Sequence, residues 1–136
     1  MASDRVRRNS TGRIVILDTS AIFMVFEYSV DLDQELTRLL GSYKIIVPQA
    51  VVDEIEILFS KGSGKQKQLA KMSLQFIQRY HIEDLGDGKN VDDIIISAAE
   101  EINGIVVTND KDLRKRLISQ KLGQIFLRQK QYLVME

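Results

Sequence analysis

Short apolar runs separated by helix-like segments are the feature that most limits what this chain can fold into. The clearest runs occupy residues 13–17, 44–47, 105–107 and 125–127. A continuous apolar run of this length is typical of a strand covered on both faces. Strands that alternate with helices favour a parallel sheet between two helical layers. We therefore predict an α/β fold, a three-layer α/β/α sandwich around a central, mostly parallel sheet.

Apolar residues recur at helical spacing between these runs. This periodicity predicts helices over residues 21–27, 31–40, 49–59, 65–80, 90–102 and 111–120. Pro48, the only proline, suits the first helical position after its strand. In the longest helix we expect an inward face, which consists of Leu69, Met72, Phe76 and Ile77. A short strand over 81–85 and an edge strand over 132–134 complete the predicted fold.

Composition narrows the class of protein. The 136 residues are 44% hydrophobic and 28% charged, as in one ordinary globular domain. The chain has no cysteine, which excludes disulfides, thiolate zinc sites and a cysteine nucleophile. The lack of cysteine suits a reducing cytosol, so we expect a cytoplasmic protein. No apolar stretch is long enough for us to expect a membrane span. We predict a flexible basic N-terminal arm over 1–12 and a single domain over 13–136.

Positive charge is concentrated in two segments although the net charge is zero. Residues 61–79 hold five basic residues and no acid, and residues 111–130 hold seven basic residues and one acid. Basic flanks beside an acidic pocket suit a protein that binds RNA, and our candidates for RNA contacts are Lys65, Lys67, Arg114 and Lys115. The alternative is that these residues form ordinary solvated helix faces.

Acidic residues at four separated places fall near strand ends or helix starts. They are Asp18, Glu54, the pair Asp92 and Asp93, and the pair Asp110 and Asp112. Carboxylates that converge repel one another unless a cation lies between them, and Mg²⁺ prefers carboxylate and water oxygens. A shared metal site at the carboxyl edge of the sheet would bring such residues together.

Each acid also has an ordinary structural explanation. Asp18, Asp110 and Asp112 suit helix caps, and first-turn acids are favoured by the helix dipole. Capping does not explain Glu54, which a helical projection places at the border of an apolar face. The alternative for Glu54 is a salt bridge with a nearby lysine. The same projection turns Asp92 toward the protein body and Asp93 toward solvent.

The chain resembles the PIN domain (PilT N-terminus) family of nucleases. The matching segments are ILDTSA at 16–21, VPQAVVDEIEIL at 47–58, VDDIIISAA at 91–99 and VVTNDKDL at 106–113. The resemblance covers the chain from Arg13. Within the family, the chain is similar to small archaeal PIN proteins that are related to ribosome-processing factors. Toxins of the VapC type share the same core.

This resemblance implies an Mg²⁺- or Mn²⁺-dependent endoribonuclease with an α/β/α fold, acting in rRNA processing or as a VapC-type toxin. It assigns the metal site to Asp18, Glu54, Asp92 and Asp110, with Asp93 and Asp112 supporting. Hydroxyls of Thr19 or Ser20 and of Thr108 match the family pattern. The implied partners are RNA and an antitoxin or ribosome-assembly factor, with a homodimer as a further expectation.

Two other classes of protein remain as alternatives. A non-catalytic RNA-binding scaffold in ribosome assembly would share the fold, although the presence of all four acids argues against it. A phosphoacceptor receiver domain is also α/β with clustered aspartates. Receiver domains need paired acids near the first strand and a late lysine, whereas Asp18 stands alone, so we rank that alternative lowest.

Overall fold

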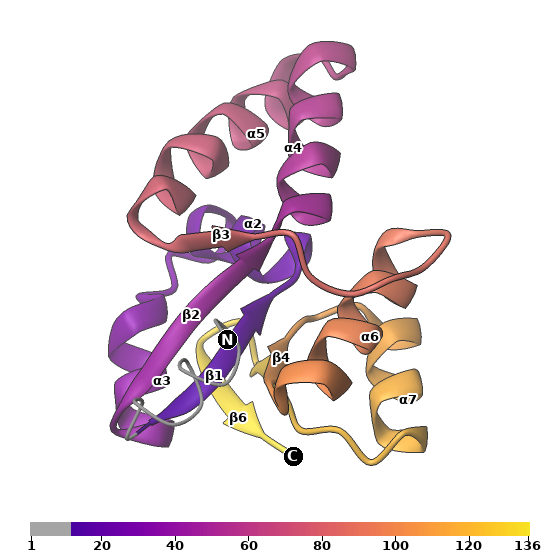
Figure 1. Cartoon of the computed structure of the whole chain (residues 1–136). Helices are drawn as coiled ribbons and strands as arrows, with labels where there is room; N and C mark the ends of the chain where they lie inside the picture. The colour runs from indigo at the N-terminus through magenta and orange to yellow at the C-terminus, as the bar shows by residue number, and fades with distance from the viewer. Residues whose placement is uncertain (1–11) are drawn as a thin grey trace.

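A six-stranded sheet with the order β3-β2-β1-β4-β5-β6 forms the centre of the computed structural model, which describes residues 12–136 (Figure 1). The strands are β1 (Arg13–Leu17), β2 (Tyr43–Pro48), β3 (His81–Glu83), β4 (Ile105–Val107), β5 (Gln124–Arg128) and β6 (Tyr132–Met135). All neighbours are parallel except β5 and β6. The predicted mostly parallel sheet is confirmed. Apart from Gly12, the predicted N-terminal arm lies outside the described residues.

Helices fill the connections between the strands. They are α2 (Thr19–Glu27), α3 (Leu32–Leu40), α4 (Gln49–Lys61), α5 (Gly64–Phe76), α6 (Val91–Ile102) and α7 (Lys111–Ser119), with a 3₁₀ turn, η1 (Ile77–Arg79). The chain moves from β1 outward to β2 and β3, then crosses back to β4 and β5. Because parallel connections are right-handed, this reversal places α6 and α7 on the opposite face from α2 and α3.

The middle strand β1 forms the centre of the core. From Val15 to Leu17 its side chains have no exposed surface, and its neighbours in the sheet are β2 and β4. Strand order reverses between β1 and β4, which is where ligands bind in open parallel sheets. The fold therefore predicts a site beyond the carboxyl ends of these two strands.

Two local predictions are wrong for identifiable reasons. Pro48 is the last residue of β2 and precedes α4, since its φ of −62° and ψ of 142° are extended. The predicted inward face of α5 is wrong at Leu69 and Met72, because the buried residues of this helix are Ala70 and Ser73. The prediction is confirmed for Ile77, which is buried in η1, and for Phe76, which packs against the core. Small residues on that face let the helix pack closely on its neighbours.

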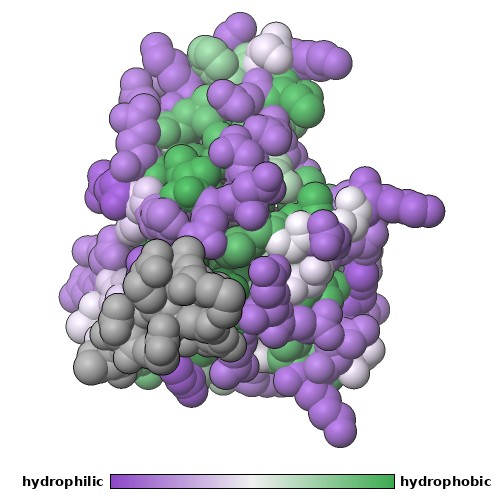
Figure 2. Space-filling view, in the orientation of Figure 1, coloured by the Kyte–Doolittle hydropathy of each residue, from purple (hydrophilic) through white to green (hydrophobic). Residues whose placement is uncertain are grey.

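Leu69 and Met72 consequently lie at the border of α5, not in the core. They line an open groove of about 630 Å³ together with Phe26 of α2. Figure 1 shows α4 and α5 as a helical hairpin that projects beyond the carboxyl edge of the sheet. Apolar residues appear among polar ones over this hairpin in Figure 2, and Ile57 of α4 is 54% exposed.

None of the described helices is long and apolar enough to cross a membrane.

Candidate active site

The carboxyl ends of β1 and β4 bring together two loops that are far apart in the sequence. Leu17 is in register with Val107, and the Asp18 N–H donates to the Val107 carbonyl at 3.1 Å. The next residues of each loop are therefore neighbours along one rim. This geometry is what places the segments 18–20 and 108–110 side by side.

Asp18 is buried, with 6% exposure, and its two carboxylate oxygens have separate partners. Oδ1 accepts the Thr19 N–H at 2.7 Å, so Asp18 caps α2. Oδ2 accepts the hydroxyls of Ser20 at 3.0 Å and Thr108 at 2.6 Å. The capping role and membership of the acid cluster are thus compatible, because each uses a different oxygen.

The balance of forces on Asp18 favours its neutral form. Burial raises the pKa of this carboxyl, and the nearby Glu54 charge raises it further. Hydrogen bonds from Thr108, Ser20 and the Thr19 backbone oppose the shift but do not cancel it. A buried carboxylate with an acidic neighbour is stabilised by a cation.

Glu54 joins this cluster from α4. It is half-buried, as the helical projection predicted, and its Oε1 accepts the Thr19 hydroxyl. Thr19 therefore contacts two acids, Asp18 through its backbone and Glu54 through its side chain. The hydroxyl links the first turn of α2 to the base of the projecting hairpin.

Asp92 and Asp93 have different surroundings in the first turn of α6. Burial raises the pKa of Asp92, followed by the charges of Asp18 and Asp110, while Arg116 opposes the shift. Asp93 is paired with Arg116 at 2.8 Å. Asp92 therefore lies in the field of the cluster, whereas Asp93 faces α7.

Asp110 caps α7 and completes the rim. Its Oδ1 accepts the Leu113 N–H at 2.9 Å, and its own N–H donates to the Thr108 hydroxyl at 3.1 Å. Thr108 thereby contacts both Asp18 and Asp110. Asp112 is exposed in the first turn of α7 and, within residues 12–136, forms no hydrogen bond or ion pair with the cluster.

Asn109 is a residue of this rim that was not among the predicted site residues. Its Oδ1 accepts the Leu127 N–H at 2.8 Å, and its backbone N–H donates to the Ser20 hydroxyl at 2.9 Å. It fixes the loop after β4 to β5 on one side and to α2 on the other. Its position between Thr108 and Asp110 was the only available signal.

The four basic candidates have unequal surroundings. Lys65 and Lys67 are exposed on α5, and the Lys67 ammonium lies 5.3 Å from the Phe59 ring centroid. Arg114 stacks on Phe126 at 3.4 Å and donates to the Gln124 side chain at 2.7 Å. Its guanidinium is thus used inside the fold, while Lys115 is exposed.

The cluster offers carboxylate and hydroxyl oxygens, the donors that Mg²⁺ and Mn²⁺ prefer. In the part of the chain that the structure describes, no group of three acids or histidines lies close enough to hold a metal ion with the side chains as they are. The oxygen donors of the cluster thus fit a hard divalent cation. To coordinate one, the carboxylate side chains of the cluster must rotate toward a common point.

Comparison with known proteins identifies the family. The family model for a PIN-like domain matches residues 15–130. The chain belongs to the PIN-like domain family. The predicted resemblance is confirmed, and the match includes all four acids of the cluster.

Two curated archaeal ribonucleases are similar to this PIN-like domain. Ribonuclease VapC4 of Methanocaldococcus jannaschii is 29% identical over 121 residues, which are 87% of this chain and 92% of the relative. Ribonuclease VapC9 of Archaeoglobus fulgidus is 30% identical over 116 residues, which are 85% of this chain and 83% of the relative. The similarity therefore extends over nearly whole domains.

Solved structures share the fold of this PIN-like domain. The PIN domain endonuclease Utp24 aligns with a TM-score of 0.73 at 22% identity, over 90% of each chain. A VapBC2 complex of Rickettsia felis, bound to a promoter DNA fragment, aligns with a TM-score of 0.64 at 22% identity. That alignment covers 85% of this chain and 99% of the other. The α/β architecture is thus confirmed.

Proposed function

We propose that this PIN-like domain is a metal-dependent endoribonuclease that hydrolyses RNA phosphodiester bonds. The observation that carries the proposal is the convergence of four acids from separate elements on one rim. They are Asp18, Glu54, Asp92 and Asp110, and the raised pKa of Asp18 and of Asp92 reflects burial beside like charges. The two curated relatives, both ribonucleases, support the same reaction.

The proposed cofactor is Mg²⁺ or Mn²⁺, held by these four carboxylates. When bound, such an ion activates a water and neutralises charge on the phosphate and the leaving oxygen. Asp18 is the fixed member, because Ser20 and Thr108 orient one of its oxygens. Glu54 is oriented by the Thr19 hydroxyl. Asp92 and Asp110 approach from the starts of α6 and α7.

Asp93 and Asp112 have weaker roles in this proposal. The ion pair with Arg116 holds Asp93 toward α7. We therefore propose that Asp93 positions Arg116 near Asp92. Asp112 is exposed outside the cluster. We therefore propose Asp92, and not Asp93, as the acid that α6 contributes.

We propose a VapC-type role in preference to rRNA processing, because both curated relatives carry the VapC name and cover most of this chain. An antitoxin is the partner that this role implies. A ribosome-assembly partner and a homodimer are secondary proposals. Each predicts a complex that can be isolated from cells that express the chain.

The test is a titration of Mn²⁺ against a fluorescent single-stranded RNA. We expect cleavage by the wild type and a loss of at least about 100-fold for Asp18→Asn, since an acid of the site is removed. Asp112→Asn is the matched control, because it makes the same chemical change on an exposed residue of the same rim. RNA binding without cleavage by the wild type would support the scaffold alternative and overturn the nuclease proposal.

A further inference from the structure

The turn between β5 and β6 has an unfavourable backbone conformation. Gln129 and Lys130 both have φ of 56°, and the Gln131 N–H donates to the Arg128 carbonyl at 3.1 Å. A β-turn with positive φ at both central positions favours Asn-Gly, because a Cβ is strained against the backbone there and Asn tolerates this conformation better than most residues. Gln-Lys is an unusual choice, and strained residues of this kind are concentrated at functional surfaces.

The strained turn places a cation against an exposed aromatic ring. The Lys130 ammonium lies 5.7 Å from the ring centroid of Tyr28, which ends α2 and is 40% exposed. The two residues are far apart in the sequence, so no local pattern indicated their contact. An exposed aromatic ring beside a cation is the arrangement that binds single-stranded nucleic acid.

This pair lies on the same rim as the acid cluster. Helix α2 begins directly after Asp18 and has nine residues, so Tyr28 is about 14 Å from that acid. At the end of β5, the Leu127 N–H is bonded to Asn109, the neighbour of Asp110. A distance of about 14 Å corresponds to roughly four stacked nucleotides.

We propose that Tyr28 and Lys130 form a binding platform for single-stranded RNA that leads into the acid cluster. A base that stacks on the Tyr28 ring displaces the Lys130 ammonium from over that ring, and the ammonium then binds the adjacent phosphate. Arg128, exposed at the start of the same turn, adds positive charge, while Glu27 beside Tyr28 is the nearest opposing charge in sequence. The platform rests on the proposed function, because it assumes an RNA substrate.

The decisive variant is Gln129→Asn combined with Lys130→Gly. It relieves the strained turn, so the melting temperature is expected to rise. It also removes the cation, so affinity for a fluorescent single-stranded RNA, measured in EDTA to prevent cleavage, falls several-fold. The slope of log affinity against log salt decreases by about 1, because one phosphate contact is lost. Tyr28→Ala is expected to weaken binding about tenfold, and Tyr28→Phe to preserve it.

Two controls separate the platform from strain and from net charge. Gln129→Asn alone relieves strain and keeps the cation, so RNA affinity stays at the wild-type value. Lys121 also has a positive φ, 58°, but lines a pocket at the amino edge of the sheet. Lys121→Gly therefore removes the same charge and the same strain away from the rim, and RNA affinity is expected to be unchanged.

The outcomes distinguish this inference from the nuclease proposal. Wild-type RNA affinity in the double variant overturns the platform, as does an equal loss in Lys121→Gly, and either result leaves manganese-dependent cleavage intact. A wild-type protein that neither binds nor cleaves RNA overturns both proposals. A gain in stability together with a specific loss of affinity supports the platform, because misfolding cannot produce that combination.

Discussion

At the scale of single residues, the acid cluster combines stabilising and destabilising contacts. Asp18 accepts three hydrogen bonds, yet burial and Glu54 keep its pKa raised. A carboxyl whose folded pKa is raised contributes stability that is complete below its unfolded pKa and is lost as pH rises through the folded pKa. Because of Asp18, the fold is therefore less stable at neutral pH than at acid pH.

Replacement of Asp18 by Asn is expected to stabilise the protein at neutral pH. In EDTA, the free energy of unfolding should increase on the order of 1 kcal/mol, or several °C in melting temperature, because the buried charge is removed. Thermal melts from pH 3 to pH 8 measure the effect. The difference from wild type should shrink as pH falls toward the ordinary value of 3.8 and should be smallest below it. A variant that is less stable than wild type at pH 7 would contradict this account.

Residue-level predictions from sequence succeeded where local geometry decides. The helical projection placed Glu54 at the border of its helix and turned Asp92 toward the protein body, since these depend on one helix alone. Asp93, projected toward solvent, is half-buried and paired with Arg116 of α7, a contact that one helix cannot indicate. It could not show that Arg114 stacks on Phe126, because that contact joins α7 to β5. The hydrogen bonds of Asn109 could not be predicted from the sequence either, since they depend on how β4, β5 and α2 are arranged in space.

At the scale of elements, one glycine fixes the loop that leads into α6. Gly86 has φ of 76°, and a Cβ there would contact the Ile94 carbonyl oxygen and lie 2.9 Å from the Ala98 nitrogen. The loop is also bonded from the Asp87 N–H to the Ser97 hydroxyl at 3.0 Å. This packing sets the start of α6 and hence the position of Asp92.

Gly86→Ala is expected to destabilise the fold by about 3 kcal/mol or more, since it adds a backbone clash to an unfavourable φ. Gly41→Ala is the matched control: its φ is 74°, but nothing lies within 4 Å of an added Cβ. That variant should lose only about 1 kcal/mol. Urea denaturation measures both, and equal losses would show that the close approach to α6 is unimportant.

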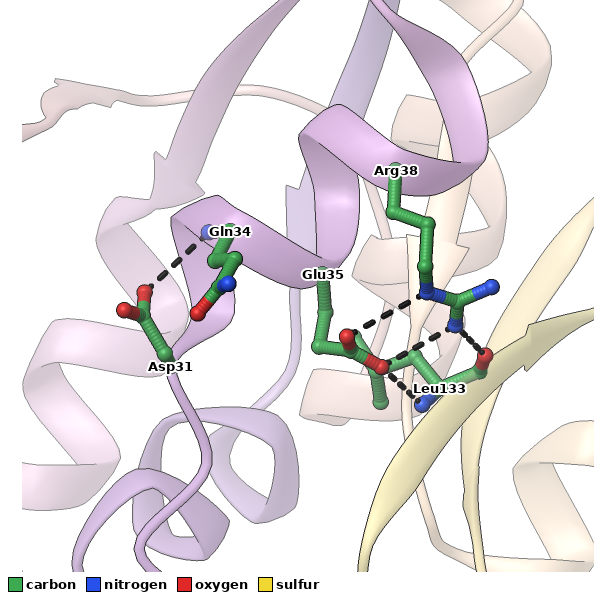
Figure 3. A network of polar contacts seen from close by, with 5 residues as sticks. All are labelled: Asp31, Gln34, Glu35, Arg38 and Leu133. Carbon is green, nitrogen blue, oxygen red and sulfur yellow. Dashed lines mark hydrogen bonds and ion pairs between the residues drawn. The ribbon is translucent and has the colours of Figure 1, made fainter.

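Two side chains of α3 close the outer edge of β6. The Leu133 N–H donates to Glu35 at 2.8 Å, and the Leu133 carbonyl accepts from Arg38 at 2.6 Å (Figure 3). Glu35 and Arg38 also pair with each other at 3.0 Å. Backbone groups that would otherwise recruit a further strand are thus occupied at this residue.

Glu35→Gln is expected to reduce stability mainly above pH 5. The bond from Arg38, and then the Leu133 N–H, lower the pKa of Glu35 from its ordinary 4.5. A lowered folded pKa gives stability that is present above the unfolded pKa and is lost as pH falls through the folded pKa. At pH 7 the loss should be at most about 1 kcal/mol, because solvent screens the pair. Urea denaturation curves of the two proteins should converge near pH 3, and a constant difference would contradict this explanation.

Boundaries of elements were predictable where caps are local. Asp110 caps α7 through its own side chain, as the sequence indicated, and Asn90 caps α6 in the same way. The inward face of α5 was not predictable from apolar periodicity. Its buried residues, Ala70 and Ser73, are small because neighbouring helices pack closely against this face. Packing of this kind depends on tertiary structure and leaves little trace in one helix.

At the scale of the whole molecule, four elements meet at the acid cluster. Strand β1 ends directly before Asp18, and helix α7 begins directly after Asp110. Helices α4 and α6 contain Glu54 and Asp92. A cation shared among them would oppose their separation during unfolding. Binding that is specific to the folded state stabilises it by mass action.

Mn²⁺ is therefore expected to raise the melting temperature of the wild type. At about 100 times its dissociation constant, the ion would add about 2.7 kcal/mol. Glu54→Gln and Asp110→Asn should reduce this gain, and Asp112→Asn should retain it. Differential scanning calorimetry with Mn²⁺ and with EDTA measures the shift. An equal gain in all three variants would indicate that the ion binds elsewhere.

The reversal of β6 separates the last residues from the rim. Met135 and Glu136 lie near Arg13 at the opposite edge of the sheet, as the position of the C-terminus in Figure 1 shows. A strand of five residues places about 17 Å between the two edges. A fluorophore or immobilisation tag fused after Glu136 would therefore lie at the edge of the sheet opposite the acid cluster. It could be used to measure ligand binding without blocking the site.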